Sequence, residues 1–117
     1  MGVNSMNKDL GSGFVLKIVS SEESKYDVYD IVLYSYNKIL FAISKKCFGR
    51  KSALYWFDTA YNQLKKIIIV ADTIKENKGT DDEQFLTNWL SELLKFWGTD
   101  NDLYKKLKKV VSDYLNI

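Results

Sequence analysis

The chain contains no histidine and no proline, and it has only one cysteine and one arginine among its 117 residues. Histidine is the usual general base near neutral pH and the commonest metal ligand, so its absence removes most nucleophile–base and metal-centred catalysis. Cys47 has no partner for an intrachain disulfide, and we expect it to pack in the interior of a protein from a reducing, cytoplasmic compartment. We therefore predict no catalytic residues and no enzymatic activity.

The sequence also lacks the motifs through which a small protein binds a cofactor. No glycine-rich phosphate loop, Gly-x-Ser-x-Gly elbow or paired-cysteine motif occurs. An all-carboxylate Mg²⁺ site is disfavoured, because charges in the first turn of a helix explain the first two of the four aspartates that would form it. Those four are Asp27, Asp30, Asp58 and Asp72. We expect no metal, no cofactor and no small-molecule substrate.

Long hydrophobic runs are missing as well. Lysines interrupt every apolar stretch well short of the roughly 18 residues that cross a bilayer, so no membrane span is expected. The first 13 residues lack the apolar segment of a secretory signal, and Met6 stands where myristoylation needs Ser or Thr. We expect residues 1–13 to be a flexible N-terminus, with residues 1–5 an added segment ahead of a native start at Met6.

What the chain does contain is an ordinary globular composition with unevenly distributed charge. Hydrophobic residues make up 46% and charged residues 27%, with a net charge of +2, which is typical of one domain with a single core. Residues 38–66 carry seven basic residues against Asp58, whereas residues 81–102 carry six acids against Lys95. Since proteins that read bases rely on arginine, specific duplex readout is not expected.

The first helix is predicted from a capping box and an apolar stripe. Residues 20–23 read Ser-Ser-Glu-Glu, and apolar residues then recur at steps of three and four from Val28 to Ile43. This pattern predicts a helix over about residues 21–46. The β-prone run at residues 14–19 has no other strand to pair with, so we expect a short extended arm there.

Three further helices are predicted, with lone glycines between them. An uninterrupted seam of a and d positions runs from Ala53 to Ile74 and overrides the β-branched run inside it. Capping residues and one-sided apolar stripes indicate the last two helices. The predicted ranges are about 51–77, 81–97 and 100–115, separated by Gly49, Gly79 and Gly98.

Together these elements predict an all-α fold, an antiparallel four-helix bundle in a single domain over residues 20–117. The long hairpin comprises about 21–46 and 51–77, and the short hairpin about 81–97 and 100–115. At 1.5 Å per residue the long helices measure about 38–40 Å and the short ones about 25 Å. About 13 Å of the long hairpin, the turn from Phe41 to Phe57, is therefore expected to project.

This projecting turn is the predicted contact surface, because an exposed aromatic cluster ringed by charge is typical of interfaces. Aromatic side chains would supply buried area, and basic ones would attract an acidic partner. The predicted partner-binding residues are Lys45, Lys46, Phe48, Arg50, Lys51, Tyr55 and Trp56. Burial of the turn as ordinary core, by tilting of the shorter helices, stays open as the alternative.

The predicted function is that of a non-enzymatic helical interaction protein, a self-associating or adaptor-type accessory subunit. Its partner is another protein or a second copy, and the acids at 81–83 could fill that role in a head-to-tail homo-oligomer. One alternative is an accessory protein that binds single-stranded DNA or RNA. Its contacts would be Lys45, Lys46, Arg50, Lys51, Lys105, Lys106, Lys108 and Lys109. A further alternative is an immunity or inhibitor protein.

Three segments carry a family resemblance: the basic turn at 45–51, the sequence Ile-Ile-Val-Ala at 68–71, and Leu-Leu-Lys-Phe-Trp at 93–97. With them, residues 26–116 resemble the four-helix-bundle proteins encoded in ribosomal RNA intervening sequences and the related accessory variability determinants of diversity-generating retroelements. Members of that family carry proline and arginine near the first turn, where this chain has a single arginine. The resemblance implies a symmetric oligomer with a basic surface that assists a nucleic-acid enzyme.

Overall fold

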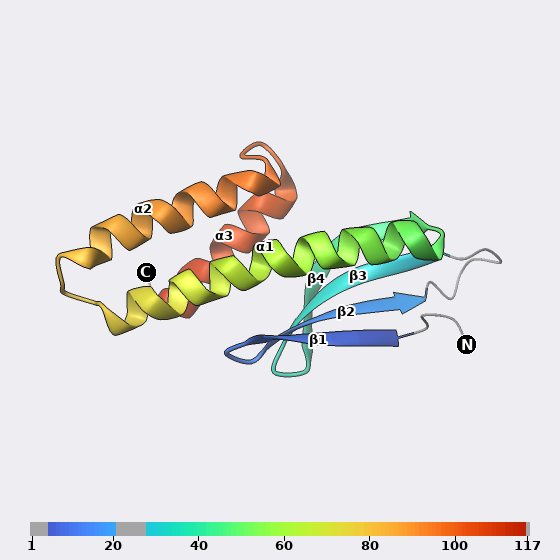
Figure 1. Cartoon of the computed structure of the whole chain (residues 1–117), viewed down its shortest axis with the longest axis horizontal. Coiled ribbons are helices and arrows are strands. Elements are labelled where there is room, and N and C mark those ends of the chain that lie inside the picture. Colours follow the sequence, from blue (N-terminus) through green and yellow to red (C-terminus); the bar gives the residue numbers. More distant parts are fainter. Residues whose placement is uncertain (1–4, 21–27, 117) are drawn as a thin grey trace. The chain divides into compact units, whose positions relative to one another are not determined.

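The structure, a computed structural model, describes residues 5–20 and 28–116, except for the side chains of Ser5, Lys45, Lys46 and Phe48. The chain divides into two compact units, Met1–Lys65 and Lys66–Ile117, and Figure 1 shows the order of their elements. The strands are β1 (Ser5–Gly11), β2 (Phe14–Ser20), β3 (Val28–Ser35) and β4 (Lys38–Phe48). The helices are α1 (Arg50–Glu76), α2 (Asp82–Leu94), the 3-10 turn η1 (Lys95–Trp97) and α3 (Asp102–Leu115).

The predicted all-α four-helix bundle is wrong, because a four-stranded antiparallel sheet precedes the helices. Its strand order is β1-β2-β3-β4, so each strand pairs with its neighbour in sequence. The helix predicted over 21–46 is replaced from residue 28 onward by β3 and β4, and residues 21–27 lie outside the described part. Ser20 is the last residue of β2. The apolar spacing in this region fits a helix face and a strand pair equally, and its β-branched and aromatic content favours strands.

The prediction of a flexible N-terminal arm is also wrong, because its described residues form strands of the sheet. Residues 5–11 form the edge strand β1, and residues 14–20 form β2, which pairs with β1 on one side and β3 on the other. Residues 14–19 have no predicted partner when residues 1–13 are interpreted as flexible and residues 21–46 as a helix. A strand becomes stable only as part of a sheet, so one wrong element excluded the others.

The core of the first unit lies between one face of the sheet and the first half of α1. Leu16 is paired with Leu33, and Ile18 with Ile31, so these four buried side chains share one face. Figure 1 shows the first part of α1 running along the sheet. That part of the helix contributes the buried residues Ala53, Phe57, Ala60 and Leu64. The first part of the a/d seam of the predicted second helix, from Ala53 to Leu64, therefore packs on a sheet.

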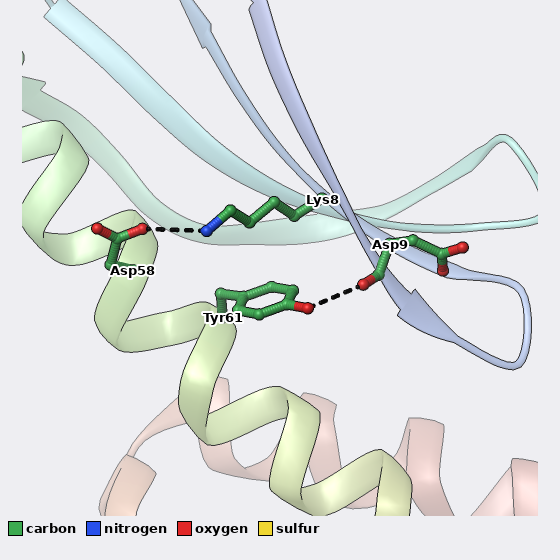
Figure 2. Close-up of polar contacts among 4 residues, drawn as sticks. All are labelled: Lys8, Asp9, Asp58 and Tyr61. Atoms are coloured by element: carbon green, nitrogen blue, oxygen red, sulfur yellow. Dashed lines mark hydrogen bonds and ion pairs between the residues drawn. The ribbon is translucent and has the colours of Figure 1, made fainter.

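Polar contacts attach the edge strand β1 to α1 (Figure 2). The Lys8 Nζ lies 3.6 Å from Asp58 Oδ1, and the Tyr61 hydroxyl donates a 3.2 Å hydrogen bond to the Asp9 carbonyl. Lys65 Nζ donates to the Leu10 carbonyl at 3.1 Å. Because they reach main-chain carbonyls, two of these three contacts fix the strand independently of its side chains.

The second unit contains the last part of α1, α2, η1 and α3, close to the ranges predicted for the last three helices. The Tyr114 hydroxyl on α3 donates to the Asp72 carboxylate on α1. Lys75 Nζ lies 3.8 Å from the centroid of the Tyr114 ring, and Lys78 Nζ donates to the Leu115 carbonyl at 3.4 Å. The buried side chains of this unit are Ile67, Ile68, Val70, Ala71, Ile74, Leu86, Leu90, Leu94, Leu107, Val111 and Leu115.

Candidate interaction surfaces

The first candidate surface lies in the first two turns of α1 and comprises Arg50, Lys51, Tyr55 and Trp56; we name it the α1 N-terminal surface. Helical spacing turns Ala53 and Phe57 toward the sheet, where both are fully buried. Tyr55 and Trp56, which lie between them, consequently face outward. Tyr55 is 64% exposed and Trp56 is 50% exposed, which is unusual for two adjacent large aromatic side chains.

The geometry and charge of this surface suit a partner that is both apolar and acidic. The rings of Tyr55 and Trp56 meet edge to face, with centroids 5.3 Å apart and planes at 77°, a favourable aromatic arrangement. Arg50 and Lys51 are exposed, and the first turn of α1 contains no acid. Their charges add to the positive end of the helix dipole, so the local potential attracts carboxylates.

The structure brings together only part of the predicted site. Lys45, Lys46 and Phe48 lie on β4, and their side chains are outside the described residues. The projecting helical turn does not exist, because Phe41 to Phe57 spans the end of β4 and the start of α1. Tyr55 and Trp56 are exposed because they lie on the outer side of a helix that covers a sheet. β4 is an edge strand, where lysines commonly discourage pairing with other chains.

The lysines of the nucleic-acid alternative form a separate group on α3. Lys105, Lys106, Lys108 and Lys109 are exposed there, opposite the buried side of the helix. Lys109 Nζ lies 3.2 Å from Asp113 Oδ2, so part of this charge is already balanced within the helix. These lysines belong to the second unit and the α1 N-terminal surface to the first, and we describe them as two surfaces.

A second candidate surface was missed by the sequence analysis, which gave the helix over 81–97 a one-sided apolar stripe. Phe85, Trp89 and Phe96 are each at least half exposed. Phe85, Trp89 and Glu92 line one side of α2, and Phe96 follows them in η1, four residues after Glu92. We name these four residues the α2 outer seam. The rings of Phe85 and Trp89 have centroids 6.3 Å apart. A shallow pocket on this side is lined by Phe85, Asn88, Trp89, Ser91 and Glu92.

The other side of α2 fills the interior of the second unit. Leu86, Leu90 and Leu94 are buried at steps of four residues. The apolar residues of 85–97 thus occupy two sides of the helix, which is more than one packed face requires. This excess width was the signal, visible in the sequence, that one apolar side would stay exposed.

A hydrogen-bonded ion pair lies within the α2 outer seam. Lys95 Nζ is 2.8 Å from Glu92 Oε1, and both side chains are more than half exposed. The hydrogen bond to Glu92, with the attraction of the same carboxylate, raises the pKa of Lys95 above its usual value. Glu92 therefore accepts from Lys95 while it lines the same pocket as Trp89.

The remaining chemistry of the described residues is sparse. Cys47 is buried, with its Sγ 3.1 Å from Ser44 Oγ, a packed position. Of the aspartates considered for Mg²⁺, Asp27 lies outside the described part, Asp58 pairs with Lys8, and Asp72 accepts from Tyr114. Over residues 5–20 and 28–116, no three His, Cys, Asp or Glu side chains gather as a metal site. No helix in these ranges has the length and hydropathy to cross a membrane.

Comparisons with protein-family models, with curated proteins and with solved structures found no match. The resemblance to the bundle proteins of ribosomal RNA intervening sequences therefore stays a prediction. The fold that it implied, a four-helix bundle, is contradicted by the four strands of the first unit.

Proposed function

We propose that this chain is a non-enzymatic interaction protein, an adaptor-type accessory subunit that binds an acidic protein segment through the α1 N-terminal surface. The observation that carries the proposal is the exposure of Tyr55 and Trp56 in edge-to-face contact beside Arg50 and Lys51. Aromatic residues and arginine are the types enriched at the centres of protein interfaces. The surface lies on a helix packed against a sheet, so little conformational freedom is lost on binding.

The free energies of burial and of association favour a small but specific contact. Complete burial of the exposed parts of Tyr55 and Trp56 would remove roughly 200 Å² of largely apolar surface from water, worth about 5 kcal/mol. Association itself costs about that much or more. The aromatic pair therefore needs flanking contacts, and charge attraction from Arg50 and Lys51 supplies both further binding energy and faster association.

A protein partner is favoured over a nucleic acid by the number of cations at the surface. The α1 N-terminal surface has two cations, Arg50 and Lys51, which could neutralise two phosphates. For a single strand this corresponds to a slope of only about −1.4 in log K against log salt concentration. Dedicated nucleic-acid proteins commonly make about six to ten phosphate contacts. The lysines of α3 would have to act from the other unit.

The test uses two labelled probes, a glutamate-rich amphipathic peptide with leucine and phenylalanine on one face and a single-stranded oligothymidylate. Fluorescence anisotropy of each probe is measured with the parent chain and with the double variant Tyr55→Ala, Trp56→Ala at about 50 and 200 mM salt. Trp89→Ala is the matched control, because Trp89 and Trp56 are equally exposed at 50%.

We expect the peptide to bind the parent and the control, and its affinity to fall roughly tenfold or more in the double variant. Binding that is equal in the parent and the double variant, or absent from both, would contradict the proposal. Tighter binding of the oligonucleotide than of the peptide, with a steep loss at the higher salt, would replace it by the nucleic-acid alternative.

A further inference from the structure

The residues of the α2 outer seam are exposed and have the spacing of a helix-pairing surface. Its positions 85, 89, 92 and 96 are separated by four, three and four residues, as consecutive d, a, d and a positions of a heptad are. The pocket on this side includes Phe85, Asn88, Trp89 and Glu92. Those four positions are related as i, i+3, i+4 and i+7, the arrangement that forms a hole for a knob in a coiled coil.

The spacing reads the same in both directions along the helix. This property is what a two-fold axis perpendicular to α2 requires, because such an axis pairs each position with its mirror image in the series. With the axis midway between positions 90 and 91, Phe85 faces Phe96 of a second copy and Trp89 faces Glu92. Both pairs then occur twice.

We propose that the α2 outer seam is a self-association surface, on which α2 of a second copy of this chain lies antiparallel about that two-fold axis. The interface has four layers, with an aromatic pair at each end and a Trp–Glu pair in each of the two central layers. It uses residues different from those of the α1 N-terminal surface, so it stands independently of the partner binding proposed above.

Charge selects the antiparallel direction. The N-terminal end of α2 is acidic, with Asp82 and Glu83 in its first turn and Asp81 directly before it. A parallel pair would place these acids beside their copies, and Glu92 beside Glu92. The antiparallel pair separates the two acidic ends by the length of α2 and η1, about 24 Å, which exceeds a Debye length of about 8 Å in physiological salt. It also opposes the two helix dipoles favourably.

Charge and aromatic content also select the register. A shift by one heptad toward the N-terminus would place Glu92 opposite Asp82 of the second copy. A shift in the other direction would leave Phe85 beyond the end of the partner helix. The proposed register instead sets the Glu92 carboxylate, which already accepts from Lys95 at 2.8 Å, opposite an indole N–H donor. A carboxylate has acceptor capacity for both bonds.

The size of the surface predicts a weak dimer. The exposed parts of the three aromatic side chains amount to roughly 300 Å² per copy, against about 800 Å² per partner in a standard interface. Flanking residues of α2 add to this area, but the total stays within the class of transient contacts. We expect a dissociation constant in the micromolar range or weaker, with Glu92 as the layer that limits affinity and fixes the register.

The experiment is sedimentation equilibrium over a wide concentration series, with far-ultraviolet circular dichroism to verify that each variant is folded. Trp89→Ala is expected to raise the dimer dissociation constant roughly tenfold or more. Trp56→Ala, equally exposed in the parent, is expected to leave it unchanged. Glu92→Leu is expected to lower the constant roughly tenfold, because it replaces the charged member of both central layers with an apolar residue.

The direction of pairing is tested with single-cysteine chains in a Cys47→Ser background and a short thiol crosslinker. A mixture of the Phe85→Cys and Phe96→Cys chains should form crosslinked heterodimers, whereas neither chain alone should crosslink. A parent that is monomeric throughout, or a Trp56→Ala loss equal to that of Trp89→Ala, would overturn the proposal. Self-crosslinking of Phe85→Cys alone would overturn the antiparallel arrangement.

Discussion

The backbone N–H of Tyr36 donates a 2.9 Å hydrogen bond to the carbonyl of Gly13. The Tyr36 ring lies so close to Gly13 that a Cβ added there would be 2.4 Å from a ring carbon. These two residues belong to different hairpin turns, Gly13 to the turn between β1 and β2 and Tyr36 to the turn between β3 and β4. The contact therefore joins the two turns at one end of the sheet.

Gly13→Ala should lower the free energy of unfolding more than an alanine at another positive-φ glycine does. Gly13 has φ +86°, and Gly79 has φ +83° with no heavy atom within 4 Å of an added Cβ. Both substitutions strain the backbone by roughly 1–3 kcal/mol, but only the first also displaces a ring. Urea unfolding followed by circular dichroism measures the difference, and Tyr36→Ala in the Gly13→Ala chain should recover part of it. Equal losses at both glycines would contradict this contact.

Tyr114→Phe should destabilise the second unit by about 1–2 kcal/mol, since it removes a hydrogen bond to a charged group. The hydroxyl donates to Asp72, and the ring beneath Lys75 Nζ is kept. Tyr104→Phe on the same helix is the control, because no hydrogen bond of its hydroxyl is seen in the described part of the chain. Thermal unfolding of both variants decides the matter, and a null effect of Tyr114→Phe would mean that water replaces the bond.

Asn101→Ala should lower the free energy of unfolding by about 1 kcal/mol, because the Asn101 side chain caps the N-terminus of α3. Its side chain accepts from the Leu103 N–H at 3.1 Å. Asp81 occupies the equivalent position of α2 but makes no side-chain cap hydrogen bond, so Asp81→Ala should cost less. Chemical denaturation compares the two, and a larger loss at Asp81 would show that its charge on the helix dipole outweighs the Asn101 hydrogen bond.

Arg50→Gln combined with Lys51→Gln should weaken binding of the acidic peptide at low salt and flatten its salt dependence. The expected change is severalfold, as for exposed charges at the rim of an interface, and it should appear mainly in the association rate. Stopped-flow fluorescence measures that rate. Tyr55→Phe keeps the ring and serves as the control. Unchanged salt dependence in the double variant would mean that other cations attract the peptide.

The helices were predictable because their evidence is local. The a/d seam from Ala53 to Ile74 continues for three heptads, and over that length a helical period cannot be confused with a strand. The start of α3 was displaced slightly, since Asn101 caps it and the helix begins at Asp102, whereas the predicted range began at about residue 100.

The sheet was not predictable in the same way, because strand pairing is a relation between distant residues. The decisive local signal was at Tyr36 and Asn37, which adopt φ +48° and +68° in a two-residue hairpin loop. Asparagine tolerates this conformation, so its position between two β-prone runs indicates a turn. The apolar stripe through these residues concealed it.

The candidate surfaces were likewise predictable only in part. Tyr55 and Trp56 were predicted to be exposed, but on a projecting hairpin; they are exposed on the outer side of α1. The exposure of Phe85, Trp89 and Phe96 was not predicted, because the apolar residues of 81–97 were interpreted as one stripe. Which of two apolar sides of α2 is buried depends on its neighbours, which periodicity does not describe.

One helix, α1, belongs to both units, and this limits how the protein can be divided. A cut between residues 65 and 66 would create two new helix ends, each with up to four main-chain groups that no longer find their partners within the helix. A dissection intended to yield independent halves therefore has to keep all of α1 in each half, duplicating it.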